Sequence, residues 1–277
     1  MSLIVNNNLT ALDAYNNLNK TSMSQSKVIS ELSSGLQIQT AADNPAGYVV
    51  SQALESQANG YQAAISNAQN GVSLIQTASG ALNQIASILQ TMNSLALSSA
   101  NGATNDTTSL NANQQEFSAL QNQIDQIANT TSFGSTKLLD GTFTSQTLQI
   151  GAFTSSANQI SISISGASTG ALSVASTSAS VGTAAAALTA AGLVQSALAA
   201  VASIEAVVGA DQNQLQAVTA NLTVGQQNLQ SAYASLVDVN FAQATTSFST
   251  DQILMQSGVS MLSQANQSSA LVLKLLQ

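Results

Sequence analysis

Apolar residues near the start of the chain recur at helical spacing. They follow one another at steps of three or four residues from Val5 to Leu18, and a second stretch runs from Met23 to Leu36. This spacing places them on one face of a helix. A glycine readily takes the left-handed conformation of a helix C-cap, so Gly35 is expected to end it. The first segment therefore predicts an amphipathic helix that ends near residue 35.

A second helix is predicted to begin at the single proline, Pro45. Asp43 or Asn44 is placed as its N-cap, and proline is well tolerated at the first helical position. From Tyr61 to Ala100 the apolar residues keep helical spacing with one slip of phase. A helix of that length measures about 60 Å. It is expected to break near Gly102, and a further helix follows.

The period changes in the middle of the chain. Residues 160–165 alternate strictly between isoleucine and serine, which is typical of a strand with one buried face. Apolar residues also alternate before this segment, at Leu148 and Ile150, and after it, at Leu172 and Val174. We therefore expect a small β-meander with a solvated serine face.

The last third of the chain has helical spacing again. Apolar residues from Leu215 to Val239 alternate steps of three and four, as in a heptad seam. Residues 249–252 (STDQ) fit a capping box and predict the start of a last helix. The predicted fold is mainly α: a long antiparallel helical rod, a coiled-coil-like bundle with the N- and C-terminal helices paired, plus a small β-meander in the middle.

Composition excludes most catalytic chemistry. The 277 residues contain four Lys, twelve Asp plus Glu, and no Arg, His, Cys or Trp, for a net charge of -8. Zinc sites and Ser-His-Asp or Cys-His catalysis need residue types that are absent, and a nucleic-acid binder needs basic residues. The carboxylates of Glu205 and Asp211 are six positions apart and share a helix face poorly. We expect no enzymatic activity, no cofactor, no metal site and no nucleic-acid partner.

Two segments bear on targeting. The first ten residues contain no Lys or Arg and no apolar block, so they are unlike a cleavable secretory signal. Residues 181–210 are apolar but mostly alanine, with polar interruptions such as Gln195 and Glu205. A membrane span needs about 20 strongly apolar residues. A buried alanine-rich helix is therefore favoured over a membrane span.

The amphipathic helices at the two ends can cover each other only in part. The remaining apolar surface is available to other copies of the chain. Subunits that join through two different surfaces form an open filament when the rotation does not close. A surface rich in amides and hydroxyls, with few charges to repel, favours such lateral contacts.

Several short motifs, taken together in their order, resemble bacterial flagellin. The similarity covers nearly all of residues 1–141 and 205–277. The motifs are residues 32–36 (LSSGL), 41–47 (AADNPAG), 70–73 (NGVS), 137–141 (KLLDG), 252–254 (QIL) and 264–267 (QANQ).

The resemblance implies a structural subunit that polymerises into the extracellular flagellar filament for swimming motility. A flagellar hook-filament junction protein, which shares related terminal helices, is the alternative, and a helical secreted adhesin or pore former is a more distant one. The implied export route is the flagellar type III apparatus, without a cleaved signal. The implied partners are other copies of the chain, the flagellar junction and cap proteins, and an export chaperone on the C-terminal helix.

The resemblance also implies a division of the chain. Residues 1–42 and 240–277 would be the terminal helices of the filament core, residues 43–140 and 181–239 the helical rod, and residues 141–180 a small β region, with no large outer domain. The expected self-assembly residues of the core are Val5, Leu9, Leu12, Leu18, Ile29, Leu32, Ile253, Leu254, Val259, Leu262, Leu271 and Leu275. The expected rod seam comprises Ile65, Val72, Ile75, Leu82, Leu89, Leu215, Val218, Leu222, Leu229 and Leu236.

One departure from the family concerns innate immunity. Many flagellins carry a QRxRELxxQ stretch that the Toll-like receptor for flagellin recognises. Residues 90–98 of this chain have the sequence QTMNSLALS instead. Both arginines and the glutamate are missing, which predicts weak receptor activation. Alternatively, these changes only follow the loss of charge along the whole chain. The altered region comprises Gln90, Thr91, Asn93, Ser94 and Leu95, with Glu116 at a nearby acidic position.

Overall fold

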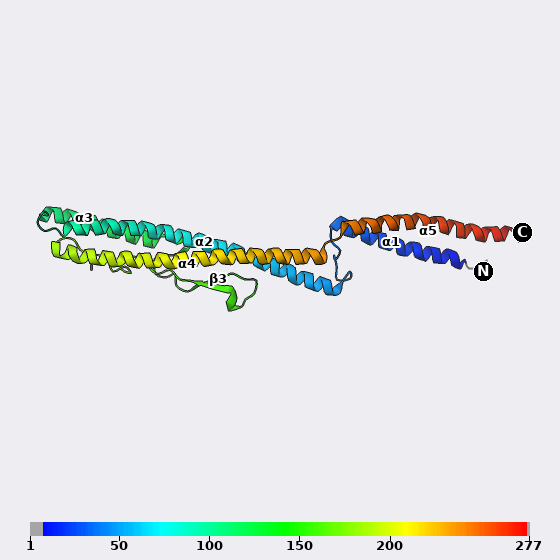
Figure 1. Ribbon diagram of the computed structural model, residues 1–277, viewed down its shortest axis with the longest axis horizontal. Helices are drawn as coiled ribbons and strands as arrows, with labels where there is room; N and C mark the ends of the chain where they lie inside the picture. Colours follow the sequence, from blue (N-terminus) through cyan, green and yellow to red (C-terminus); the bar gives the residue numbers. More distant parts are fainter. Residues whose placement is uncertain (1–7, 276–277) are drawn as a thin grey trace. The chain divides into compact units, whose positions relative to one another are not determined.

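The computed structural model describes residues 8–275, with side chains as far as residue 267. The protein is mainly helical, as predicted, and Figure 1 shows its elements. It divides into two compact units. The terminal unit comprises residues up to 56 and from 228 onward, and the central unit comprises residues 57–227.

The terminal unit is built on a pair of helices, α1 (Leu9–Ser34) and α5 (Phe241–Leu275), which lie side by side in Figure 1. The side chain of Asn8 caps α1 by accepting from the amide of Ala11, and its Nδ2 donates to the carbonyl of Ala265 at 3.0 Å. Gly35 ends α1 with φ 76°. The predicted antiparallel pairing of the terminal helices and the predicted end of α1 are both confirmed.

The predicted start of the last helix is wrong. Helix α5 begins at Phe241, and Asn240 lies before it with its Oδ1 accepting from the amide of Gln243 at 3.3 Å. Ser249 lies inside the helix, where its hydroxyl donates to the carbonyl of Thr245 at 2.9 Å. A serine within a helix bonds the carbonyl four residues earlier, so the same four-residue pattern occurs without a helix start.

Helix α2 (Pro45–Ser99) is a single helix of 55 residues. It begins where the proline predicted, and the Oδ1 of Asn44 accepts from the amide of Gly47 at 2.9 Å. The division between the two units falls within α2 and within α4 (Ala184–Val237). Both helices therefore contribute residues to each unit.

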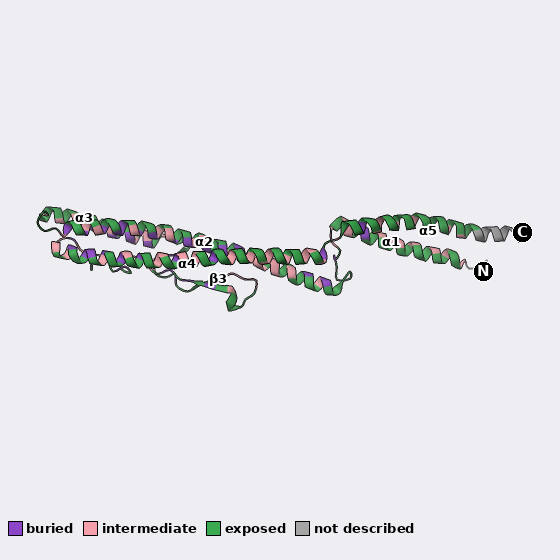
Figure 2. Ribbon diagram, in the orientation of Figure 1, coloured by how far each residue is buried: buried purple, intermediate pink, exposed green. Residues whose placement is uncertain are grey.

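In the central unit, α2 and α4 pack with α3 (Thr107–Thr130), whose N-cap is Asp106. Figure 2 shows the buried residues gathered along these three helices. The long apolar side chains of this core are fully buried, and small residues of α4 complete it. The largest buried side chains include Ile75, Leu82, Ile85, Leu89, Met92, Phe117, Ile124 and Leu215.

The β structure is smaller than a meander. Strands β1 (Ser132–Phe133) and β2 (Thr136–Lys137) form one antiparallel pair, and β3 (Gln146–Gln149) and β4 (Gln159–Ile162) form another. A 3-10 turn, η1 (Ser156–Asn158), precedes β4. The alternation in β4 is confirmed, because its isoleucines are buried and its other residues are exposed.

The segment around Leu172 and Val174 forms turns rather than a third strand of that sheet. Both side chains are buried, which is why their spacing resembles that of a strand. Their backbone is held by hydrogen bonds within the turns, such as Leu172 to Ser168 and Val174 to Thr169, both at 2.9 Å.

Helix α4 is long and apolar enough to cross a membrane by length and composition alone, with a mean hydropathy of 1.7 in its most apolar window. A third of that window is buried within the protein. The buried residues there are mainly alanine and valine, including Ala187, Ala190, Val194, Ala197 and Val201, and they belong to the core shared with α2 and α3.

Candidate functional site

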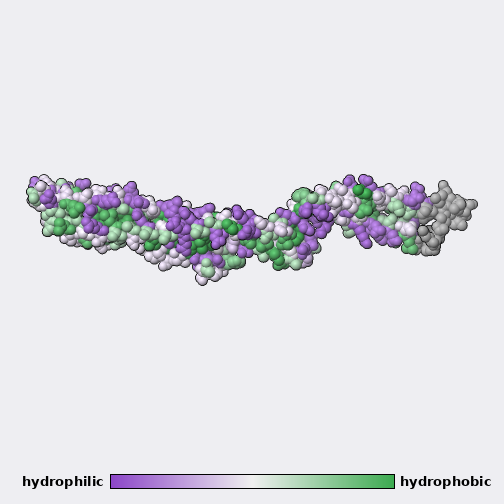
Figure 3. Space-filling view, viewed as in Figure 1, coloured by the Kyte–Doolittle hydropathy of each residue, from purple (hydrophilic) through white to green (hydrophobic). Residues whose placement is uncertain are grey.

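The terminal helix pair exposes much of its apolar surface. Leu9 on α1 is 57% exposed, and Ile253 and Val259 on α5 are 63% and 54% exposed. Figure 2 shows few buried residues on α1 and α5, and Figure 3 shows apolar residues on their visible surface. Among the residues whose side chains are described, the two helices bury few apolar side chains, which leaves a surface suited to contact with further helices.

The predicted core residues fall into three groups. Besides the three residues above, Leu12, Ile29 and Leu254 are exposed, whereas Leu18, Leu32 and Leu262 are half-buried. Leu18 lies against Gly258, where an added Cβ would meet its Cδ1 at 3.0 Å. Val5 lies outside the described residues, and Leu271 and Leu275 lie in a part of α5 whose side chains are not described.

The residues of the predicted rod seam are buried or half-buried. Ile65, Ile75, Leu82, Leu89 and Leu215 are buried, and Val72, Val218, Leu222, Leu229 and Leu236 are half-buried. Leu229 and Leu236 belong to the terminal unit by the division given above.

Glycines allow α2 and α4 to approach closely in the central unit. A Cβ added at Gly71 would lie 3.0 Å from Cδ1 of Leu215, and one added at Gly225 would lie 2.6 Å from Cε2 of Tyr61. A hydrogen bond of 2.7 Å from Nε2 of Gln226 to Oε1 of Gln62 joins the same two helices. These contacts fix the register of the two helices.

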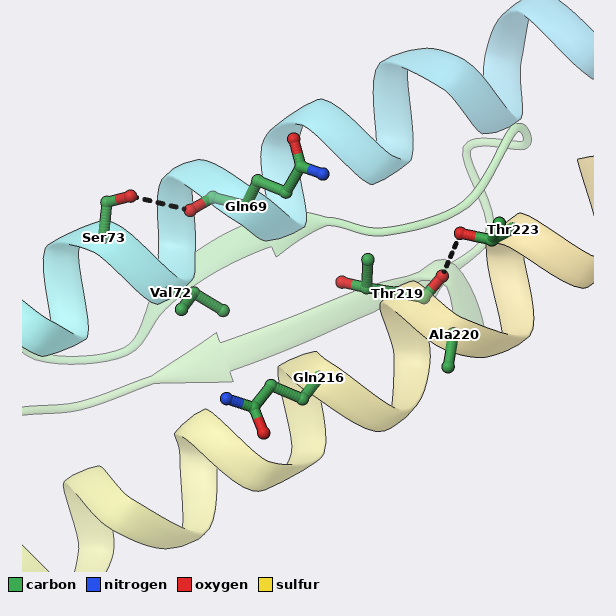
Figure 4. Close-up of a pocket in the computed structure, with 7 residues that line it drawn as sticks. All are labelled: Gln69, Val72, Ser73, Gln216, Thr219, Ala220 and Thr223. Carbon is green, nitrogen blue, oxygen red and sulfur yellow. Dashed lines mark hydrogen bonds between the residues drawn. The ribbon is translucent and has the colours of Figure 1, made fainter.

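A shallow groove of about 500 Å³ lies between α2 and α4 (Figure 4). Its hydroxyls are already used within their own helices: Ser73 donates to the carbonyl of Gln69, and Thr219 and Thr223 donate to carbonyls one turn earlier. None of its lining residues is ionisable, so the groove offers amide and apolar contacts but no acid, base or activated nucleophile. The lining residues are Gln69, Val72, Ser73, Gln216, Thr219, Ala220 and Thr223.

The structure places the altered receptor region on two adjacent helices. Gln90, Thr91 and Ser94 are exposed on α2, and Asn93 and Leu95 are half-buried. Glu116 is exposed on α3. A hydrogen bond of 2.9 Å from Asn113 to Ser99 joins these helices near their connecting turn.

Three polar residues of α3 hold the turns before α4, and the sequence did not reveal them. Gln114 accepts from the amide of Val181 at 2.6 Å, Gln121 donates to the carbonyls of Val174 and Ala179 at 2.7 and 3.2 Å, and Asp125 accepts from Thr169. Their positions, 114, 121 and 125, have the spacing of one helix face. Polar residues on a core-facing stripe are the signal that could have identified them.

Charged groups gather at the connector between α1 and α2. The ammonium of Lys27 lies 3.4 Å from Oδ1 of Asp43 and 3.9 Å from Oε1 of Glu31. Hydrogen bonds from the backbone amide and then the hydroxyl of Thr40, with further help from Lys27, lower the pKa of the Asp43 carboxyl. The sequence predicted Asp43 only as a possible N-cap.

Other carboxylates stabilise local turns. The side chain and backbone amide of Ser109 lower the pKa of Asp106 at the start of α3, and Thr142 does the same for Asp140. Burial raises the pKa of Asp211 on α4. Asp106 and Asp140 thus hold their own local turns.

Comparison with known proteins gives the family. Residues 5–144 match the family model for the bacterial flagellin N-terminal helical region, and residues 191–276 match that for the C-terminal helical region. Flagellin of Halalkalibacterium halodurans is 36% identical over 275 positions, covering 99% of this chain and 100% of the relative. Flagellin of Bacillus subtilis is 35% identical over 302 positions, covering 99% of each.

Another relative matches more closely over a shorter length. Flagellin of Clostridium tyrobutyricum is 50% identical over 140 residues, which is 50% of this chain and 37% of the relative. Among solved structures, the crystal structure of Bacillus cereus flagellin is similar with a TM-score of 0.50 and 25% identity, covering 57% of this chain and 88% of that one. The family models at both ends and the relatives aligned along the whole chain show that this protein belongs to the bacterial flagellin family.

Proposed function

We propose that α1 and α5 form the self-assembly surface through which this flagellin joins its filament. Flagellin is the subunit of the flagellar filament, a structural polymer outside the cell that serves motility, and not an enzyme. The observation that supports the proposal is the set of exposed apolar residues on the α1–α5 helix pair, including Leu9, Ile253 and Val259.

Burial of these side chains would supply energy for polymerisation. Burying one exposed isoleucine or leucine contributes about 2 kcal/mol. Several of these side chains on each subunit would contribute toward the cost of association, which is about 4 to 15 kcal/mol. We place residues 1–42 and 240–277 in the filament core, residues 43–140 and 181–239 in the rod outside it, and residues 141–180 as its small β region.

The same surface is relevant to partners that bind the subunit before assembly and to partners at the two ends of the filament. An apolar face on α5 needs cover until it meets other subunits, which supports an export chaperone on the C-terminal helix. The flagellar junction and cap proteins would contact the two ends of the polymer, and export would use the flagellar type III apparatus without a cleaved signal. The junction and cap proteins and the export route are proposed from the family, and the chaperone also from the exposed face of α5.

A matched pair of variants tests the surface. Ile253→Ser changes α5, and Phe153→Ser changes a loop residue of the β region that is similarly exposed, at 60% against 63%. Purified monomers of each are seeded with filament fragments, and the critical concentration is measured by sedimentation and electron microscopy. Loss of about 2 kcal/mol raises the critical concentration about thirtyfold for Ile253→Ser, whereas Phe153→Ser is expected to assemble like the natural protein.

Normal assembly of Ile253→Ser, with circular dichroism showing both monomers folded, would overturn the assignment of this surface. Deletion of residues 250–277 gives a second test. It is expected to abolish assembly while the core around Leu82 and Leu215 keeps its thermal transition.

A further inference from the structure

The connector between α1 and α2 contains a carboxylate that binds its own backbone. The Oδ2 atom of Asp43 accepts hydrogen bonds from the amide of Thr40 at 3.0 Å, the hydroxyl of Thr40 at 3.0 Å and the amide of Gln39 at 3.3 Å. Its Oδ1 atom faces the ammonium of Lys27 at 3.4 Å. One charged side chain thus closes residues 39–43 into a loop and ties that loop to α1.

The rest of the connector is held without charge. Ile38 is buried and lies against Gly47, at the start of α2. The side chain of Gln39 donates to Ser34 and accepts from Ser30, both on α1 and both at 2.9 Å.

The backbone provides another neutral anchor. The amide of Gln37 donates to the carbonyl of Val237 at 2.6 Å, and that of Val239 donates to the carbonyl of Gly35 at 2.9 Å. These anchors do not depend on the charge of Asp43.

We propose that Asp43 is a charge-dependent latch: neutralising it releases the backbone amides of Gln39 and Thr40 and opens the turn they close, while the neutral anchors keep α1 and α2 in place. A carboxylate accepts hydrogen bonds about twice as strongly as a neutral group does, so protonation weakens all four contacts together. The latch makes this connector acid-sensitive in a chain that carries few charges.

The surrounding charges agree with this role. Lys27 of α1 contacts both Asp43 and Glu31. Asp238, between α4 and α5, pairs with Leu36 of the α1–α2 connector, and Tyr48 lies in the first turn of α2. Lys27 is 54% exposed, so protons and salt reach the site. The lowered pKa of Asp43 means that the loop is closed at neutral pH and opens as the pH falls below the ordinary range of an aspartate.

Amide hydrogen exchange of the full-length monomer tests the latch. Protection of the Gln39 and Thr40 amides is measured from neutral to acid pH, relative to the intrinsic rate at each pH. Natural protein is expected to lose about tenfold in protection as Asp43 is protonated, since one charge-assisted hydrogen bond contributes about that factor. Asp43→Ala and Asp43→Asn are expected to show low protection at every pH.

Glu31→Gln is the matched control, because it removes a carboxylate from the same lysine without touching the connector bonds. Its protection is expected to follow the natural protein. Lys27→Met keeps the bonds from Thr40 to Asp43. Its amide protection is expected to lie between that of the natural protein and that of the Asp43 variants. The helical circular dichroism of every variant is expected to stay unchanged.

Either of two results in hydrogen exchange would overturn the proposal, and so would one in circular dichroism. One is protection at Gln39 and Thr40 that is unchanged in both Asp43 variants. The other is protection in the natural protein that does not depend on pH. This second measurement does not rely on the folding of any variant. Loss of helix in Asp43→Asn at neutral pH would also refute it, because the helices would then depend on the latch.

Discussion

Replacing Gly225 with alanine probes the packing of α4 against α2 in the central unit. The new Cβ would lie 2.6 Å from Cε2 and 3.2 Å from Cδ2 of Tyr61, whereas alanine at Gly209 on the same helix meets no atom within 4 Å. Both changes gain the helix propensity of alanine, about 1 kcal/mol. Only Gly225→Ala also forces a ring to move, at an overpacking cost of about 1 to 3 kcal/mol.

Gly209→Ala is therefore expected to stabilise the protein by about 1 kcal/mol, and Gly225→Ala to be about 1 to 3 kcal/mol less stable than Gly209→Ala. Each kcal/mol shifts the melting temperature of a domain of this size by about 2 to 4 °C. Thermal and urea denaturation of the monomer, followed by circular dichroism, measure both values.

A third variant identifies the cause. In a Tyr61→Ala background the obstacle is gone, so Gly225→Ala is expected to stabilise as Gly209→Ala does. Equal stabilisation by the two glycine changes in the natural background would refute the close packing of Tyr61 on Gly225. A destabilisation that persists without Tyr61 would place the cause elsewhere.

Three further predictions rest on other parts of the chain. Gln121→Leu leaves the carbonyls of Val174 and Ala179 unpaired and is expected to cost about 2 to 4 kcal/mol in urea denaturation; a loss below about 0.5 kcal/mol would contradict the role of Gln121. Assembled filaments are expected to persist at pH about 4 and in about 1 M salt, where carboxylates begin to protonate and exposed charges are screened, and sedimentation showing depolymerisation would contradict this. The lowered pKa values of Asp43, Asp106 and Asp140 stabilise the folded protein above the pKa of an unfolded aspartate, and this stability is lost only as the pH falls through the folded pKa values. The raised pKa of Asp211 has the opposite effect, because its charged form is destabilised in the folded protein. A reporter-cell assay is expected to give a weaker Toll-like receptor response than an arginine-bearing flagellin gives, and introducing arginine at Thr91 and Asn93 is expected to raise it; an equal response from the natural protein would count against this.

Periodic apolar positions predicted the helices well because long regular stripes permit few other structures. The C-terminal end of α1 was predicted from Gly35 and the start of α2 from Pro45, because the backbone preferences of glycine and proline are local. The seam residues Ile75, Leu82 and Leu215 are buried as their spacing required.

Other features could not be read from the pattern because they depend on partners far along the chain. The STDQ motif around Ser249 does not start a helix, since α5 already begins at Phe241. Leu172 and Val174 are buried in turns and not in a strand. Gln121, 53 positions away from Val174, holds these turns by donating to the carbonyl of Val174. The binding of Lys27 to Asp43 depends on how the connector turns after Gly35.

The hydrogen bond between Asn8 and Ala265 joins groups 257 positions apart. Helix α1 thus has its partner far along the chain, and it stays unpaired until α5 has been synthesised. Contacts of such separation form late, because the chain entropy of closing the loop is lost before any contact compensates it. Pairing of the chain ends is therefore expected to be the last and most easily reversed step of folding, and proteases are expected to attack the monomer there first.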